Sequence, residues 1–318
     1  MPATIRKSSS QAFLDYVSPF EWGAPLEYLS ARATPGLEIV RDQGYWRTVR
    51  IDDRVGIVGV SHDAERGRLR VWHTASLAHP TVRAQLLLSL RRLFDLDTDL
   101  RPIVECLSRD ARLAPLVRQR PGLRVPGTTS GFDLAVRAIL GQQVSVRGAT
   151  TLAGRLAAAV GEPLPPTLDL PPRARMLGLS HTSPTPARLA DAGVERIARI
   201  GLPRARAATL VHLSRAVAEG AIDLSPGPGA ESVIERMLEL PGIGPWTAQY
   251  VALRALRLPD AFPESDLGLR RAMGGMSATE LRRAAERWRP WRGYGAIHLW
   301  VSSGISGTES YSWPGDAR

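Results

Sequence analysis

Residues 238–250 read LELPGIGPWTAQY, and this stretch decides how the C-terminal half of the chain folds. An apolar helical pattern enters it from Val233, and proline and glycine interrupt that pattern at 241–244. Gly242 and Gly244 flank one apolar residue, which favours a tight turn whose backbone a partner can approach closely. Pro245 suits the first position of a new helix, because its φ is fixed and it has no N–H to satisfy. The stretch therefore predicts two helices joined by a short hairpin.

This hairpin resembles the helix-hairpin-helix motif of DNA-binding proteins. Free N–H groups at the turn and at the start of the second helix form a natural phosphate site. Contacts of this kind grip the DNA backbone without reading its sequence. The resemblance implies that Gly242, Gly244 and Thr247 bind DNA. The alternative is an ordinary turn between two helices of a bundle.

The N-terminal part of the chain has a different pattern. Short apolar runs at residues 37–40, 46–51, 55–60 and 69–72 predict a small antiparallel sheet, with a short helix over 25–33 before it. From Pro80 the apolar spacing becomes that of amphipathic helices. Helix signals then follow at 130–140, 150–160, 186–190, 203–218, 232–240, 246–256, 266–273, 278–288 and 293–302. Residues 163–172 contain five prolines and predict an extended link.

These patterns predict an α+β fold with a small antiparallel-sheet N-terminal domain at 12–98. A two-lobed, all-helical helix-hairpin-helix region is expected at 99–303, with its second helical lobe at about 130–230. Residues 304–318 are rich in Gly and Ser, and we expect a flexible tail there.

Net charge indicates the class of binding partner, and cysteine content limits the kinds of disulfide, cluster or metal site. The 318 residues have a formal net charge of +10, which favours an anionic partner, with nucleic acid first. Lys7 is the only lysine among the 41 basic residues, and all the others are arginine. A genomic bias toward arginine codons is an alternative reason for this preference over lysine. The single cysteine, Cys106, excludes a disulfide framework, a cysteine-ligated iron–sulfur cluster and a multi-cysteine zinc site within this sequence.

No apolar run approaches the length of about 18 residues that a membrane span needs. We therefore expect a protein without a membrane segment, located in the cytoplasm and associated with the nucleoid.

Further segments carry a resemblance to a known family. Asp266 follows Gly244 by 22 residues, as an aspartate of the base-excision pocket does in helix-hairpin-helix DNA glycosylases. Residues 20–22, 132–146, 287–292 and 298–300 agree with the same family. On these segments the chain resembles DNA-3-methyladenine glycosylase II of the AlkA type. The resemblance implies a monomeric enzyme that removes N-alkylated bases from double-stranded DNA and requires no cofactor.

The resemblance assigns the catalytic role to Asp266. Breaking an N-glycosidic bond puts oxocarbenium-like charge on the sugar. A fixed carboxylate stabilises that charge and can orient or deprotonate the attacking water. Two alternatives stay open: Asp266 only caps the helix that follows, or the neighbouring Glu264 is the catalytic carboxylate.

Aromatic residues are the candidates for base binding. N-alkylated purines carry positive charge, and aromatic rings attract them with about 0.5–2 kcal/mol for each cation–π contact. Trp246 and Tyr250 lie four residues apart and share one helix face. The resemblance implies that they line the pocket with Trp300, and that Tyr28 supplies a wall from the N-terminal domain. The alternative for each is core packing.

Two further features follow from the resemblance. Gln143 occupies the position where the family commonly has a leucine wedge that fills the space left by a flipped base. Glutamine can fill that gap and hydrogen-bond the orphaned base, so this wedge is not purely apolar; an ordinary polar residue at a helix end is the alternative. The backbone carbonyls of Leu238, Leu240 and Ile243 are the expected ligands of a monovalent cation at the hairpin.

Strand cleavage is not expected. Relatives that cut DNA use a lysine in the hairpin helix, and Trp246 occupies that position here. Because Lys7 is the only lysine, a monofunctional glycosylase that leaves an abasic site is the prediction. Two other functions remain open: a helix-hairpin-helix DNA-binding protein without catalysis, and a glycosylase for other damaged or mismatched bases.

Overall fold

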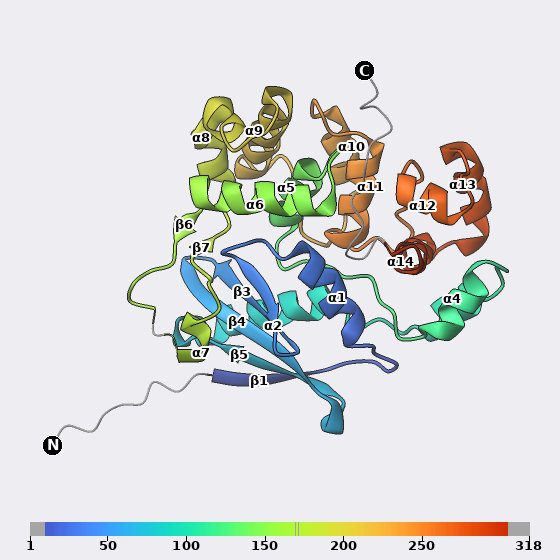
Figure 1. Cartoon of the computed structure of the whole chain (residues 1–318), viewed down its shortest axis with the longest axis horizontal. Helices are drawn as coiled ribbons and strands as arrows, with labels where there is room; N and C mark the ends of the chain where they lie inside the picture. The colour runs from blue at the N-terminus through green and yellow to red at the C-terminus, as the bar shows by residue number, and fades with distance from the viewer. Residues whose placement is uncertain (1–9, 169, 171, 305–318) are drawn as a thin grey trace.

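The computed structural model describes residues 10–168, 170 and 172–304 (Figure 1). An antiparallel sheet forms the N-terminal part, and helices form nearly all the rest. The α+β class predicted from the sequence is therefore confirmed. Residues 305–318, and with them most of the expected tail, lie outside the described residues. In the described part, no helix is long and apolar enough to cross a membrane.

The sheet has five strands in the order β1-β5-β4-β3-β2. The strands are β1 (Ser10–Asp15), β2 (Glu38–Arg41), β3 (Gly44–Ile51), β4 (Arg54–Asp63) and β5 (Arg68–His73). All neighbours pair antiparallel, as Val60 opposite Tyr45 and Val71 opposite Val60 illustrate. Sequence analysis missed β1, because it is an edge strand held by pairing with β5, which is distant in sequence.

Two helices cover the apolar face of the sheet. They are α1 (Gly23–Arg32) and α2 (Pro80–Phe94). Leu69 and Val71 point from the sheet into a core that Leu86 and Leu90 complete, and all four are fully buried. Burying each such side chain stabilises the folded state by about 1.5–3 kcal/mol. Because the apolar residues alternate along β5, they lie on one face of the sheet, and the helices pack against that face.

The helical region begins with α3 (Arg101–Leu107) and α4 (Leu113–Gln119), which sequence analysis did not predict. It continues with α5 (Gly131–Leu140), α6 (Val146–Val160), α7 (Pro172–Arg175), α8 (Pro186–Ala198) and α9 (Arg204–Ala218). It ends with α10 (Ala230–Glu239), α11 (Pro245–Arg254), α12 (Leu267–Ala272), α13 (Ala278–Ala285) and α14 (Arg292–Ser302). A two-stranded ribbon of β6 (Glu162–Pro163) and β7 (His181–Thr182) lies between α6 and α8.

Local signals set several helix limits. Ser130 caps α5 by accepting the Asp133 N–H at 3.1 Å, as its position before the apolar run predicts. Helix α8 extends beyond the predicted 186–190 because it continues past a kink at Gly193, whose φ is +71°.

The helices pack around two cores. One contains residues of α5, α6, α8 and α9, and the other gathers α3, α4 and α12–α14. Val233, Ile234 and Tyr250 pack against both, so α10 and α11 lie at the junction of the two groups (Figure 1). The first core extends to Ala255, past the expected lobe limit near 230. The expected limits 12–98 and 99–303 stay predictions.

Candidate active site

The predicted hairpin joins α10 to α11. Gly242 has a φ of +88°, and a Cβ there would lie 2.0 Å from Thr209 Oγ1, so no larger residue fits. Gly244 is extended, and a Cβ built on it meets nothing within 4 Å. Pro245 is the first residue of α11, as predicted. The turn therefore presents open backbone at the start of a helix, which suits an approaching phosphate.

Asp266 lies where three N–H groups converge. Trp246 Nε1 donates to Oδ2 at 2.8 Å, and Trp300 Nε1 donates to Oδ1 at 2.9 Å. Oδ1 also accepts the backbone N–H of Leu269 at 2.9 Å, so Asp266 is the N-cap of α12. The capping alternative is therefore confirmed, and the same carboxylate also accepts from the two indoles, while its catalytic role stays a prediction.

The expected aromatic residues form one cluster. The rings of Trp246 and Tyr250 stack with centroids 5.3 Å apart, and Trp300 meets Tyr250 edge-on at 6.2 Å. Tyr28 reaches the cluster from α1, with its hydroxyl 2.9 Å from that of Tyr250. The structure thus brings together side chains from three helices and the N-cap of a fourth. Their assignment to base binding stays a prediction.

Arg254 belongs to the same cluster, and sequence analysis missed it. Its Nε donates to Pro126 O at 2.7 Å and its Nη2 to Gly127 O at 3.0 Å, while Nη1 donates to the Tyr250 hydroxyl. The side chain is buried. The spacing 246, 250, 254 places it on the same face of α11 as the two aromatics, and this was the available signal.

The two tyrosines have shifted acidities. Burial raises the pKa of Tyr28 to about 12, although Arg254 and Arg32 oppose the shift. Burial would also raise the pKa of Tyr250, but the same two cations and the hydrogen bonds from Tyr28 and Arg254 outweigh it and lower that pKa. Tyr250 is therefore the more acidic phenol of the pair.

The turn after α5 touches the hairpin. Gln142 Nε2 donates to Gly242 O and to Thr247 Oγ1, both at 3.0 Å. Gln143 follows with a φ of +56° and an exposed side chain. Thr247 is buried, and its hydroxyl accepts from Gln142, so its contact with DNA stays a prediction. The wedge role of Gln143 stays a prediction.

Glu264 lies in a different environment. It lines a pocket of about 160 Å³ with Trp246 and Ser265, and its Oε1 accepts from Arg282 Nη1 at 3.4 Å. Both indole N–H donors of the cluster go instead to Asp266. The geometry therefore favours Asp266 over Glu264 as the carboxylate of the site.

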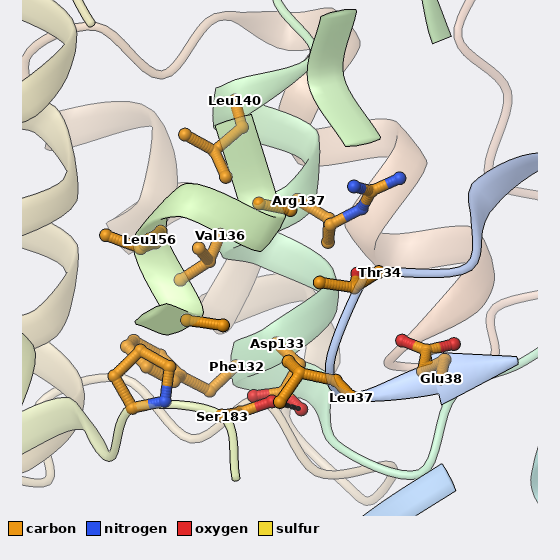
Figure 2. A pocket seen from close by; sticks show the side chains of 13 residues that line it. Thr34, Leu37, Glu38, Phe132, Asp133, Val136, Arg137, Leu140, Leu156 and Ser183 are labelled. Carbon is orange, nitrogen blue, oxygen red and sulfur yellow. Dashed lines mark hydrogen bonds between the residues drawn. The ribbon is translucent and has the colours of Figure 1, made fainter. Parts of the chain in front are cut away.

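A smaller cavity lies beside β2, α5 and α6, and none of these aromatic residues lines it (Figure 2). Its volume of about 30 Å³ holds no more than a water or two. Asp133 borders it, accepting from Ser183 Oγ at 2.8 Å and lying 3.4 Å from Arg47, and burial raises the Asp133 pKa. These contacts join the sheet to the helical region, so we interpret the cavity as structural.

The hairpin also offers oxygen ligands. Among described residues, the carbonyl of Leu240 accepts from the Ile243 N–H at 3.1 Å, whereas those of Leu238 and Ile243 receive no backbone hydrogen bond outside the helices. Carbonyl oxygens at a helix C-terminus carry partial negative charge and suit a hard cation. The monovalent cation expected at the three residues stays a prediction. Within the described part of the chain, no cluster of His, Cys, Asp and Glu could hold a metal ion.

Comparison with family models gives two matches. Residues 11–130 match the AlkA N-terminal domain, and residues 136–292 match the HhH-GPD superfamily of base excision DNA repair proteins. The two segments together span most of the chain.

Two curated relatives are similar over nearly the whole chain. DNA-3-methyladenine glycosylase 2 of Escherichia coli strain K12 is 36% identical over 291 residues, which cover 92% of this chain and 97% of the relative. A Mycobacterium tuberculosis protein named "Probable bifunctional transcriptional activator/DNA repair enzyme AlkA" is 40% identical over 306 residues. The match covers 94% of this chain but only 58% of the length of that relative.

Solved structures show the same fold. The 3-methyladenine DNA-glycosylase of Archaeoglobus fulgidus has a TM-score of 0.78 at 23% identity, covering 93% of this chain and 98% of its own. The 8-oxoguanine glycosylase/lyase of Clostridium acetobutylicum, in complex with DNA, has a TM-score of 0.69 at 16% identity, covering 90% and 92%.

Proposed function

This chain belongs to the HhH-GPD superfamily of base excision DNA repair proteins, in the branch with an AlkA N-terminal domain, and we propose that it removes N-alkylated bases from duplex DNA. We propose further that it acts as a monomer on nucleoid DNA in the cytoplasm and leaves an abasic site. The curated relatives named for 3-methyladenine support the substrate class, and the surplus of arginine supports a DNA partner.

One observation carries the proposal: the Asp266 carboxylate is held by the indole N–H groups of Trp246 and Trp300 and by the N-terminus of α12. Three donors fix its position before substrate arrives, which is the condition for electrostatic stabilisation of a transition state. As the C1′–N bond lengthens, positive charge grows on the sugar, and a carboxylate beside it lowers the barrier. The same carboxylate orients the attacking water.

The surrounding residues supply binding. A base inside the helical stack cannot reach Asp266, so the damaged nucleotide leaves the stack at a cost of a few kcal/mol, less for a damaged base. The rings of Trp246, Tyr250 and Trp300 offer it aromatic surface. Gln143, held beside the hairpin through Gln142, fills the gap. The hairpin backbone at Gly242 and Gly244 holds the phosphates.

A monovalent cation at Leu238, Leu240 and Ile243 belongs to this proposal. When bound, it adds positive charge beside the phosphate that the hairpin holds. It takes no part in breaking the glycosidic bond, so no cofactor is required for the chemistry.

The proposal excludes strand cleavage through a Schiff base. Trp246 occupies the position at which DNA-cutting relatives have the lysine whose amine is the nucleophile. Its indole instead donates a hydrogen bond to Asp266. Incubation with damaged duplex and borohydride is expected to trap no covalent adduct, whereas a lysine-dependent glycosylase on the same duplex traps one. An adduct with this protein would contradict the monofunctional mechanism.

Replacement of Asp266 tests the function itself. Asp266→Asn keeps the shape and the oxygen that accepts from Trp300 and Leu269, but it removes the charge and the acceptor for Trp246. We expect release of methylated bases from alkylated DNA to fall at least about 100-fold, while binding to an abasic duplex is retained. Asp223→Asn, at an exposed loop, is the matched control. Equal release by wild type and Asp266→Asn would leave a DNA-binding role without this catalysis. Release of oxidised or mismatched bases alone would favour the other glycosylase class.

A further inference from the structure

One side chain joins the turn after α5 to the hairpin between α10 and α11. Gln142 Nε2 donates to Gly242 O and to Thr247 Oγ1, both at 3.0 Å, across 100 and 105 positions of sequence. A backbone carbonyl can only accept, so the side-chain amide must present its NH2 group to the hairpin. The direction of both bonds therefore follows from the chemistry of the groups.

On the hairpin side, Gly242 is held from two directions. Helix α9 lies so close that a Cβ on Gly242 would be 2.0 Å from Thr209 Oγ1, and Gln142 holds the carbonyl oxygen. The next N–H, that of Ile243, is used within the turn. The N–H after it belongs to Gly244, and no backbone carbonyl among the described residues accepts it. A donor fixed before its ligand arrives loses less freedom on binding, so the hairpin is prepared for a phosphate.

On the other side, Gln142 precedes a residue in an unusual conformation. Gln143 has a φ of +56°, which favours glycine, and its side chain is exposed. Such a conformation costs free energy and persists only where the surrounding contacts hold it. Gln142 supplies one contact, and Ser145 supplies the other by capping α6, where its Oγ accepts the Gly148 N–H at 3.1 Å. Gln143 is therefore presented from a turn that is anchored at both ends.

We propose that Gln142 is a positioning residue that couples the hold of the hairpin on a DNA phosphate to the entry of Gln143 into the duplex. This rests on the proposed function, whose hairpin and wedge it joins. Leu140 of α5 and Val251 of α11 are fully buried in one core, and such packing resists sliding. Gln142 extends that connection to the surface. A phosphate on the hairpin then places Gln143 against the base stack, and Gln143 in the gap retains the phosphate.

Coupling of this kind makes the effects of two substitutions non-additive. The test is a double-variant cycle on affinity for an abasic duplex. Gln142→Met keeps the length of the side chain, removes its donors and is expected to weaken binding on the order of tenfold. In the wild-type background, Gln143→Gly is expected to weaken binding about tenfold. In the Gln142→Met background, the same change is expected to cost about threefold or less.

Two controls separate coupling from general damage to the fold. Gln43 has the same φ in an exposed turn of the sheet, so Gln43→Gly added to Gln142→Met should weaken binding no further. An undamaged duplex of the same sequence has no gap to fill. On that duplex, Gln143→Gly should change the affinity little in either background, whereas Gln142→Met should still weaken binding through the hairpin.

Thr247 gives an independent pair of variants at the other end of the bridge. Thr247→Val removes one acceptor of Gln142, so it should also reduce the cost of Gln143→Gly on the abasic duplex. Thr247→Ser keeps the hydroxyl and should restore that cost in full. A defect of folding alone would lower the affinity by the same factor with either residue at 143.

The outcomes distinguish this inference from the function on which it rests. Equal costs of Gln143→Gly in the wild-type and Gln142→Met backgrounds would overturn the coupling, as would equal costs in the two Thr247 variants. Release of methylated bases from alkylated DNA is measured separately with the wild type. A protein that shows the coupling but releases no base would refute the proposed chemistry at Asp266 and leave the role of Gln142 in DNA binding.

Discussion

Trp300 donates its indole N–H to Oδ1 of Asp266 at 2.9 Å, across 34 positions of sequence. The donor lies near the end of α14 and the acceptor caps α12, so packing of these two helices sets the position of the carboxylate. The opposite oxygen is held by Trp246 in the same manner. The aromatic residues therefore orient the proposed catalytic group as well as offering stacking surface.

This relationship predicts the effect of Trp300→Phe. Phenylalanine keeps an aromatic ring but cannot donate to Asp266. We expect single-turnover release of 7-methylguanine to slow about tenfold, equivalent to one hydrogen bond to a charged group. Trp72→Phe, in the sheet, should leave the rate unchanged. A Trp300→Phe rate equal to that of wild type would show that the carboxylate needs no orientation from this indole.

The wedge role predicts the effect of Gln143→Gly. Glycine adopts the φ of +56° without strain, so the change removes the side chain and leaves the turn. We expect binding to an abasic duplex to weaken on the order of tenfold, because the space left by the missing base is no longer filled. Gln43 has the same φ of 56° in an exposed turn of the sheet, and Gln43→Gly is the matched control. Equal affinities for both variants would assign no wedge role to Gln143.

The cation predicted at the hairpin has a simple test. We expect affinity for an abasic duplex to fall about tenfold when potassium is replaced by tetramethylammonium at constant ionic strength. Constant ionic strength keeps the release of counterions from DNA the same in both buffers. Titrating potassium back should restore binding. An affinity that is the same in the two buffers would argue against a cation at Leu238, Leu240 and Ile243.

Buried His298 predicts how stability depends on pH. Burial, helped by Arg120, lowers its pKa to about 4 in the folded state, against an unfolded value near 6.5. Between these values the unfolded chain binds more protons, so the stabilisation is complete above pH 6.5 and is lost as the pH falls toward 4. The full effect is about 3 kcal/mol.

Chemical denaturation across this pH range checks the prediction for His298. The unfolding free energy of wild type should rise with pH over this range. For His298→Gln, the slope of that rise should be smaller by about 1.4 kcal/mol per pH unit. The slopes from other histidines are common to both proteins and cancel. An unchanged slope for His298→Gln would mean that this histidine is protonated when folded.

Local sequence predicted the helices whose ends are set by residues close by in the chain. Ser130 marked the start of α5 and Pro245 that of α11, because caps and first-turn residues act within a few positions. Helices α3 and α4 were missed because each is seven residues long and has no side-chain cap. Such short helices depend on packing, here through residues such as Leu107 and Val117 in the core.

The sequence by itself determined the hairpin, the α+β order of elements and, through family resemblance, the candidates Asp266, Trp246, Tyr250, Trp300 and Tyr28. Only the tertiary structure decided how these side chains meet. Tyr28 and Tyr250 are 222 positions apart, and no local pattern encodes a 2.9 Å contact over that distance. Arg254 escaped notice because arginine is usually exposed, and only the folded chain supplies the buried carbonyls of Pro126 and Gly127 that hold it. Helix periods and caps are local, whereas the contacts of the site arise only when α1, α11, α12 and α14 pack together.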